Sequence, residues 1–178
     1  MNAKREPTSK ENATLRLFLR FSLCYLLSCP VAVLFAARGV LQAIPDRVGA
    51  VEFLFVPLAL LGALLTVTKP YLILLSMGKA FYDISVLYSV TRWAKQGVIG
   101  ILPWNACFFL TVFSLLLFLA AAARAELFSF LNTARDIRLI FSRPFGYYLL
   151  EILLFTALSL SLYYLFPQLY TTFGLIRS

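Results

Sequence analysis

The chain contains no histidine among its 178 residues. Histidine carries protons near neutral pH, and it is a common ligand of haem iron, zinc and copper. Its absence excludes histidine-based proton relays, histidine-ligated haem or chlorophyll, and the commonest zinc and copper sites. It also removes the base that most often activates a serine or cysteine nucleophile.

Cysteine is scarce as well, with Cys24, Cys29 and Cys107 present and no CxxC spacing among them. An odd number at these spacings indicates neither a disulfide framework nor a metal site. All three lie in apolar stretches, where we expect them to act as small packing residues. The motifs GxSxG, HExxH, GxGxxG and the Walker loop are also missing. The sequence therefore predicts neither an enzyme nor a cofactor.

Charged residues make up 13% of the chain and apolar residues 61%, whereas a water-soluble domain carries about a quarter charged residues. Two runs, Val98–Ala123 and Phe145–Pro167, are almost uninterrupted apolar sequence. Each exceeds the roughly 20 residues with which a helix crosses a hydrocarbon core, and neither carries the charged stripe of a soluble helix. The sequence predicts an integral membrane protein of the all-α class, a polytopic transmembrane helical bundle.

Two further spans are expected before these runs. Thr14–Ala37 is too long for the apolar region of a signal peptide, so it is interpreted as a retained first helix that Pro30 kinks or locally breaks. Val51–Thr68 is a shorter candidate, with Glu52 at its outer edge. A turn is expected after it at Lys69, because a lysine at mid-membrane costs roughly 3 kcal/mol on insertion scales.

The stretch Tyr71–Val90 has two possible interpretations. Its polar residues Ser76, Lys79 and Asp83 recur at i, i+3 and i+7 and share one face. Lys79 and Asp83 are i,i+4 partners that can neutralise each other. The stretch is either the third of five spanning helices or an amphipathic helix at the cytoplasmic interface, which leaves four spans. Pro70, just before it, suits the first position of a helix.

The division of the chain follows from these spans. Residues 1–13 are a short polar tail, 14–170 one transmembrane bundle, and 171–178 a second short tail. Residues 124–143 are polar enough to leave the membrane, and we expect an interfacial or connecting helix there. With five spans and a cytoplasmic N-terminus, this arginine-rich connector lies in the cytoplasm, as the positive-inside rule prefers. We therefore favour five spans over four.

Four residues form a candidate polar site within the membrane: Glu151, Lys79, Asp83 and Asn105. Glu151 lies about two turns inside the last span, where a carboxylate is costly and is by default a functional hypothesis. It could bind a cation or carry a proton, or it could form an internal pair with Lys79, or contact Arg143 or lipid headgroups. Asn105 is a lone amide that suits a hydrogen bond between helices.

The net charge of +8 comes from basic residues in short segments between apolar runs. Such residues indicate retention on the cytoplasmic side and contact with anionic lipid headgroups rather than nucleic acid. Trp93 stands between two cations, a position typical of an anchor at the membrane interface. The expected interfacial anchors are Arg16, Arg20, Trp93, Lys95, Arg135, Arg138 and Arg143.

Leu75–Leu131 contains a glycine-bearing helix, LSMGKAFYDISVLYSV, a loop ending in Gly97, and an apolar helix that opens with ILPWN. This order resembles the stage II sporulation protein M-like family of small bacterial membrane proteins. Pro103, Trp104 and Asn105 would occupy the Pro-polar step of that family. The resemblance implies five or six helices and a non-enzymatic partner protein in a larger envelope complex.

Two functions remain open from the sequence. The first is a non-catalytic subunit or scaffold of a multi-protein membrane complex, which suits the small size and the aromatic content of 16%. The second is a small permease or channel that uses Glu151 and the Lys79/Asp83 pair. Transporters usually have internal repeats, and we find none here. We favour the first, in a bacterial cytoplasmic membrane with the N-terminus inside.

The predicted topology can be tested with a single cysteine at Asn132, in a background without the three native cysteines. Because the four arginines of residues 124–143 resist translocation, this cysteine should not react with a membrane-impermeant thiol reagent added to sealed cells. It should react once the cells are permeabilised. Rapid labelling in sealed cells would contradict five spans and leave four.

Overall fold

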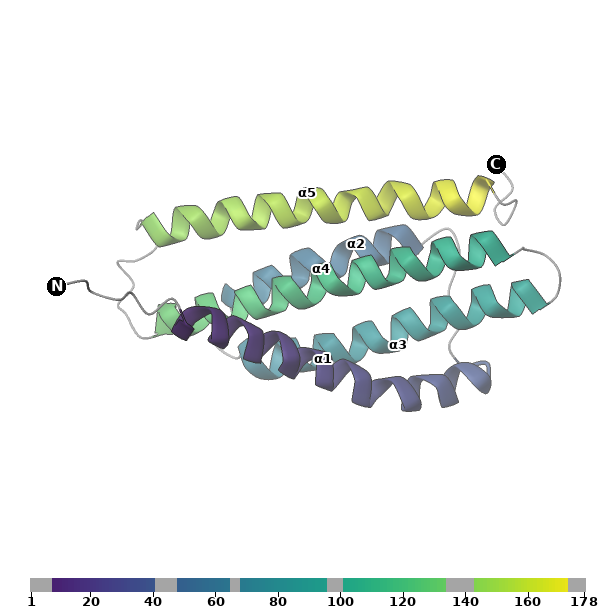
Figure 1. Ribbon diagram of the computed structural model, residues 1–178, viewed down its shortest axis with the longest axis horizontal. Helices are drawn as coiled ribbons and strands as arrows, with labels where there is room; N and C mark the ends of the chain where they lie inside the picture. Colours follow the sequence, from purple (N-terminus) through teal and green to yellow (C-terminus); the bar gives the residue numbers. More distant parts are fainter. Residues whose placement is uncertain (1–7, 41–47, 65–67, 96–100, 134–142, 173–178) are drawn as a thin grey trace.

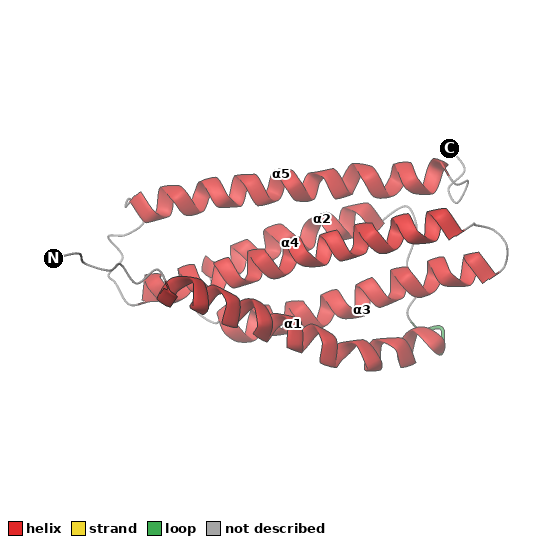
Figure 2. Cartoon of the chain, in the orientation of Figure 1, coloured by secondary structure: helices red, strands yellow, loops and turns green. Residues whose placement is uncertain are grey.

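The computed structural model describes residues 8–40, 48–64, 68–95, 101–133 and 143–172. Nearly all of these residues are helical, and the described ranges contain no strand (Figure 2). The class is therefore all-α, as predicted. In chain order the elements are α1 (Thr8–Ala37), α2 (Val48–Leu61), the 3₁₀ turn η2 (Gly62–Leu64), α3 (Thr68–Lys95), α4 (Ile101–Thr133) and α5 (Arg143–Thr172).

The helices lie lengthwise beside one another, and α4 runs between α1 and α5 (Figure 1). Neighbours in sequence run antiparallel. Lys69 at the start of α3 lies 4.0 Å from Glu126 near the end of α4, and Trp104 near the start of α4 donates a hydrogen bond to Thr91 near the end of α3. The ends of these helices therefore alternate between the two ends of the bundle.

Four described helices are long and apolar enough to cross a membrane, by length and composition. Their apolar segments are Ala13–Ala37, Thr68–Lys95, Trp104–Ser129 and Gly146–Leu169. A shorter apolar helix, Val48–Leu64, lies among them. This set of helices has the length and composition that an integral membrane protein requires. The short helix covers the shorter second span expected from the sequence.

Two tyrosines from other helices donate hydrogen bonds to carbonyl groups in the last turn of the short helix α2. The last carbonyl groups of a helix have no partner within the helix. Tyr71 of α3 donates its hydroxyl to the carbonyl of Leu58 at 3.0 Å, and Tyr148 of α5 donates to the carbonyl of Leu60 at 2.8 Å. The 3₁₀ turn η2 follows directly at Gly62–Leu64 and tightens the end of the helix.

The predicted connecting helix at 124–143 differs from the structure. α4 continues through Arg124 to Thr133, so residues 124–133 are not a separate connecting helix. The reason is packing, because Glu126 is buried and the ring of Phe128 stacks on Tyr148 with centroids 3.9 Å apart. The remainder of the predicted connector, 134–142, lies outside the described residues.

The water-facing polar side that the interfacial interpretation of Tyr71–Val90 requires is not present in the structure. α3 runs from Thr68 to Lys95, with Pro70 in its first turn, as expected. Ser76, Lys79 and Asp83 share one face, as predicted, but each is completely buried against other helices. A polar face of this kind is not available to water or headgroups.

Gly39, just after α1, has a φ of +73°, which lies in the left-handed region that favours glycine. α1 itself is continuous through Pro30, and its ribbon changes direction along its length (Figure 1).

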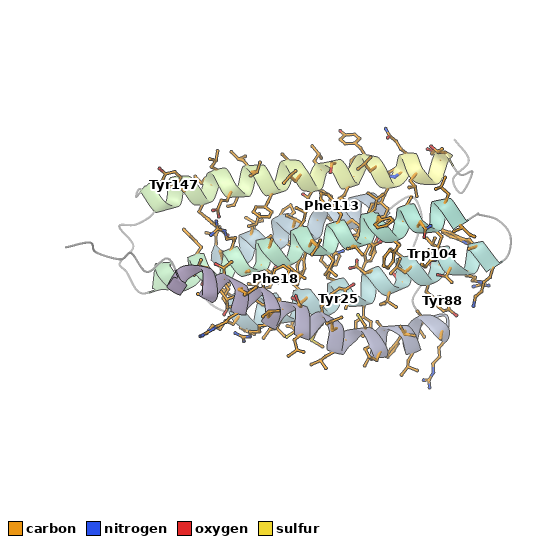
Figure 3. All side chains as sticks on the ribbon, viewed as in Figure 1. Phe18, Tyr25, Tyr88, Trp104, Phe113 and Tyr147 are labelled. Atoms are coloured by element: carbon orange, nitrogen blue, oxygen red, sulfur yellow. The ribbon has the colours of Figure 1, made fainter. Side chains whose placement is uncertain are left out.

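Large apolar side chains point outward as well as inward. Phe118, Phe166 and Leu72 are fully buried in the core. In contrast, α1 and α5 expose rows of leucines, and Tyr147 at the beginning of α5 is 70% exposed (Figure 3). An outer surface this apolar suits a surrounding of lipid or partner helices.

The close approach of α2 to α5 depends on Gly49. A Cβ there would lie 2.8 Å from the carbonyl oxygen of Tyr163 and 2.9 Å from Cδ of Pro167. Backbone and a proline ring cannot move aside as a flexible side chain can, so Gly49→Ala should lower the free energy of unfolding by about 1–3 kcal/mol.

The control is Gly146→Ala, since a Cβ on Gly146 in α5 would meet nothing within 4 Å. That change should be neutral, or stabilising by up to about 1 kcal/mol through helix propensity. Unfolding titrations of both variants in mixed micelles measure the difference. Equal stability of the two variants would contradict the close approach of α2 and α5.

Candidate functional site

Three fully buried charged side chains meet near the middle of the bundle. The ammonium nitrogen of Lys79 lies 2.5 Å from Oε2 of Glu52 and 2.5 Å from Oδ1 of Asp83. All three side chains are 0% exposed. Tyr25 and Ser114 complete the group, which is called the buried charge cluster below.

The outer members of the cluster are hydroxyl donors from two further helices. Tyr25 of α1 donates to Oδ2 of Asp83 at 2.8 Å, at the place where α1 meets α3 (Figure 3). Ser114 of α4 donates to Oε2 of Glu52. The cluster therefore joins α1, α2, α3 and α4 through side chains that are each buried.

Local helix geometry places these groups. Lys79 and Asp83 are one turn apart on α3, so both point to the same side. Phe55 lies nearly one turn after Glu52 on α2, and its ring centroid is 5.2 Å from the Lys79 nitrogen. The ring face attracts the cation, and the Lys79 side chain is 0% exposed. Lys79 is thus held by two carboxylates and one aromatic face.

The cluster contains two carboxyl groups and one ammonium. One oxygen of Glu52, Oε1, is buried and has no hydrogen-bond partner among the described residues. An isolated charge in an apolar interior is very unfavourable, so the attraction of Lys79 is what makes the carboxylates tolerable there. The arrangement can lock four helices together, and the unpaired oxygen could also hold a proton.

The predicted Lys79–Asp83 pair is present, but two other predicted site residues lie elsewhere. Glu151 pairs with Arg124, whose Nη2 lies 2.8 Å from Oε1. Both side chains are partly exposed, at 43% for Arg124 and 30% for Glu151. The suggested pairing of Glu151 with Lys79 is therefore wrong. Asn105 is half-buried on α4, nine residues or about 13 Å along the helix from Ser114.

The expected interfacial anchors divide into three groups. Arg16 and Arg20 are exposed, and Arg20 also contacts Glu126 at 3.3 Å. Trp93 is half-buried and packs against the core, while Lys95 is exposed at the end of α3. The third group cannot be placed: Arg135 and Arg138 lie outside the described residues. Arg143 is the first residue of α5, but its side chain is not among those described.

Sequence reasoning missed the role of Glu52, which it placed at the outer edge of its helix. A signal was present, because Glu52 is the sole charged residue of Val48–Leu64, and a lone charge in an apolar helix needs a partner. Tyr25 and Ser114 gave no comparable signal, since hydroxyl residues are common in such helices. Glu126 was also missed as the buried acceptor of Arg20 and Lys69.

Comparisons with known proteins add nothing to this geometry. No family model, no curated protein and no solved structure matches the chain. The resemblance to the stage II sporulation protein M-like family therefore stays a prediction. Its Pro103-Trp104-Asn105 step falls in the first turns of α4. Among the described residues, no three cysteine or acidic side chains gather where they could hold a metal ion.

Removing the cation alone should destabilise the protein much more than replacing all three charged residues of the buried charge cluster. Lys79→Met leaves two buried carboxylates without a cation and should lower the free energy of unfolding by about 3–5 kcal/mol. Adding Glu52→Gln and Asp83→Asn removes those charges and should restore most of the loss.

The matched control is Arg92→Met, which removes an exposed cation from the end of the same helix and should change stability by less than about 1 kcal/mol. Unfolding titrations of the four proteins in mixed micelles provide the measurement. A triple variant no more stable than Lys79→Met would show that Lys79 does not stabilise the bundle through the two carboxylates.

Proposed function

We propose that this chain is a non-catalytic integral membrane protein that acts as a subunit or scaffold of a larger membrane assembly. The observation that carries the proposal is the use of its buried ionisable groups. Glu52, Lys79 and Asp83 are completely buried and bind one another across helices. Their chemistry is used to fix the arrangement of the bundle, as a structural membrane component requires.

The positions of the cavities support the same proposal, because neither of the two described below reaches the buried charge cluster. Two cavities, of about 610 and 320 Å³, open on the sides of the bundle. The larger is lined by residues of α1, α4 and α5, and the smaller by residues at the paired ends of α3 and α4. No member of the buried charge cluster lines either cavity. A substrate in one of them would not touch the buried charges.

The proposed topology has five crossings. With 14 α-helical and three 3₁₀ residues, the second crossing is about 27 Å long. A bilayer with a core of roughly 30 Å can thin locally to match it. The antiparallel order brings Arg20, Lys69 and Arg124 to the same end of the bundle. The positive-inside rule places that end, with the N-terminus, in the cytoplasm.

The outer faces supply the surface for partners. α1 and α5 each expose several leucines, and α5 also exposes Tyr147, Tyr163 and Tyr164. Tyrosines combine a large apolar ring with a hydroxyl, which suits contact with both partner helices and the headgroup layer. Other integral membrane subunits and anionic lipids are the partners that this surface fits.

A second candidate function, a permease that carries protons or cations, is favoured by one observation. The cluster has one carboxyl group more than it has ammonium groups, and Oε1 of Glu52 is buried without a partner among the described residues. Such a group can take up and release a proton if an access path opens. Glu52 then replaces Glu151 as the leading residue of this alternative, since Glu151 is partly exposed and paired with Arg124.

The two functions give different results with three variants. For a subunit, Glu52→Gln and Glu151→Gln should leave the associated proteins bound. Leu116→Arg should release them, because it places a charge on a half-exposed apolar face of α4 at a cost of several kcal/mol near the membrane midplane. For a permease, Glu52→Gln should abolish transport while the protein remains inserted and abundant.

The measurement is extraction in gentle detergent followed by mass determination of the assembly, together with a growth or transport assay for each variant. Leu116→Phe serves as the control, since it adds bulk at the same position without charge. Wild-type protein that travels alone, or activity lost in Glu52→Gln with Leu116→Arg tolerated, would refute the subunit proposal in favour of the permease.

A further inference from the structure

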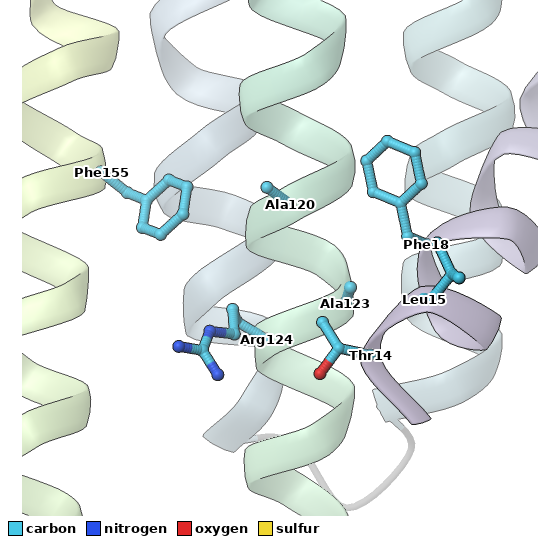
Figure 4. A pocket seen from close by; sticks show the side chains of 7 residues that line it. All are labelled: Thr14, Leu15, Phe18, Ala120, Ala123, Arg124 and Phe155. Carbon is cyan, nitrogen blue, oxygen red and sulfur yellow. The ribbon is translucent and has the colours of Figure 1, made fainter. Parts of the chain in front are cut away.

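A groove lies on the face of α4 between α1 and α5. α1 packs on α3 and α4, whereas α5 packs on α2 and α4, so the two outer helices leave part of α4 uncovered. The groove has a volume of about 610 Å³. Ala120 and Ala123 of α4 form its floor, Phe18 of α1 and Phe155 of α5 stand on either side, and Arg124 lies at one end (Figure 4).

The groove is amphipathic along its length. Phe18, Ala120 and Phe155 make its inner part apolar, and the guanidinium of Arg124 makes one end cationic (Figure 4). That end coincides with the basic end of the bundle, where Arg20 and Lys69 surround Glu126. A ligand that fits both parts has an anionic group at one end and an apolar chain at the other.

We propose that this groove binds an anionic phospholipid, with its phosphate on Arg124 and its acyl chain along Ala120 and Ala123. The inference rests on the proposed embedding of the chain in a membrane and names a lipid partner at a specific place. Basic pockets between transmembrane helices at the cytoplasmic side are suited to anionic headgroups. Arg124 is close enough to Thr14 of α1 for both to line the same end.

Arg124 keeps donors for a phosphate despite its pairing with Glu151. The contact with Glu151 uses Nη2 of Arg124, and a guanidinium has five N–H donors in a planar fork. Its side chain is 43% exposed, so the remaining donors can be reached. A phosphate can accept two of them in parallel, which is the geometry that distinguishes arginine from lysine. Glu151 competes for the same cation and weakens the binding of an anion.

A partner helix fits the groove less well than a lipid chain. A helix with side chains is 10–12 Å wide and rises 5.4 Å per turn, so one turn occupies about 500 Å³. The groove therefore holds little more than one turn, while a helix that crosses the bilayer needs contact over several. An acyl chain is much thinner and can continue from the groove into the surrounding bilayer.

The test measures lipid retention by native mass spectrometry of the purified protein in detergent with added phosphatidylglycerol or phosphatidylcholine of identical acyl chains. The wild type should retain phosphatidylglycerol preferentially. Arg124→Gln should lower this retention roughly tenfold, as expected for loss of a charge-assisted contact. Glu151→Gln should raise it, because the competing carboxylate is gone. Arg92→Gln, an exposed cation at the opposite end of the bundle, should leave it unchanged.

A second test fills the groove with a larger side chain. Ala120→Leu should lower the retention of both lipids, whereas Leu116→Phe, one turn earlier on α4, should not. Equal retention of the two lipids by the wild type, or equal loss in Arg124→Gln and Arg92→Gln, would overturn the proposal. So would a cysteine at Ala120 that crosslinks to a second protein while lipid retention is unchanged.

Extraction with alkaline carbonate tests the underlying membrane proposal separately from the lipid site. If alkaline carbonate releases the protein from membranes, the chain is not integral and the proposed function fails. If the protein stays in the membrane but shows no preference for phosphatidylglycerol, only the lipid site is refuted.

Discussion

The ammonium group of Lys79 is the charge on which the interior of this bundle depends. It lies between Glu52 and Asp83, and each of these carboxylates also accepts a hydroxyl hydrogen bond. Removing an ion from water is very unfavourable, and close partners must compensate for it. Since the partners come from α1, α2, α3 and α4, helices packed at another register would bury unpaired charges. Such arrangements are therefore disfavoured by the free energy of burying those charges without a partner.

α5 has no residue in the buried charge cluster, and its position is set by contacts with both ends of α2. Tyr148 donates to the carbonyl of Leu60 at one end of their contact, and Gly49 permits the close approach of Tyr163 at the other. The pair Arg124–Glu151 adds a partly exposed link to α4, and exposed ion pairs stabilise little. α5 is thus fixed along α2 rather than against α1. The groove on α4 results from this placement, since α1 is fixed to α3 through Asp83.

The helices could largely be predicted, because the length and hydropathy of a segment are properties of that segment alone. The apolar runs predicted helices on every segment where the structure has a long one, and the i, i+3, i+7 spacing correctly placed Ser76, Lys79 and Asp83 on one face. The extent of α4 could not be predicted in this way. Arg124 suggests departure from an apolar layer, but burial of Glu126 against Arg20 and Lys69 depends on helices distant in sequence.

The candidate site could be predicted only in part for the same reason. The Lys79–Asp83 pair is a contact within one helix, so spacing reveals it. Glu52 is 27 residues from Lys79, and Tyr25 is 58 residues from Asp83, so both contacts depend on tertiary packing. A count of charges narrows the choice, because Glu52 is the lone charge of its helix and Lys79 has room for a second acceptor. Such a count identifies a missing partner but not the helix that will supply it.

The geometry of the cluster also bears on the choice between scaffold and carrier. A carrier must change the surroundings of its charged groups during each cycle, and any opening that exposes Lys79 must separate it from at least one carboxylate. Here each carboxylate is also bound by a hydroxyl from another helix, Asp83 by Tyr25 of α1 and Glu52 by Ser114 of α4, so moving either carboxylate disturbs a further helix. A permanent internal support has no such requirement. The more helices share one buried cation, the larger the motion needed to reach it, and this coupling is what favours a fixed structural role for the buried charge cluster.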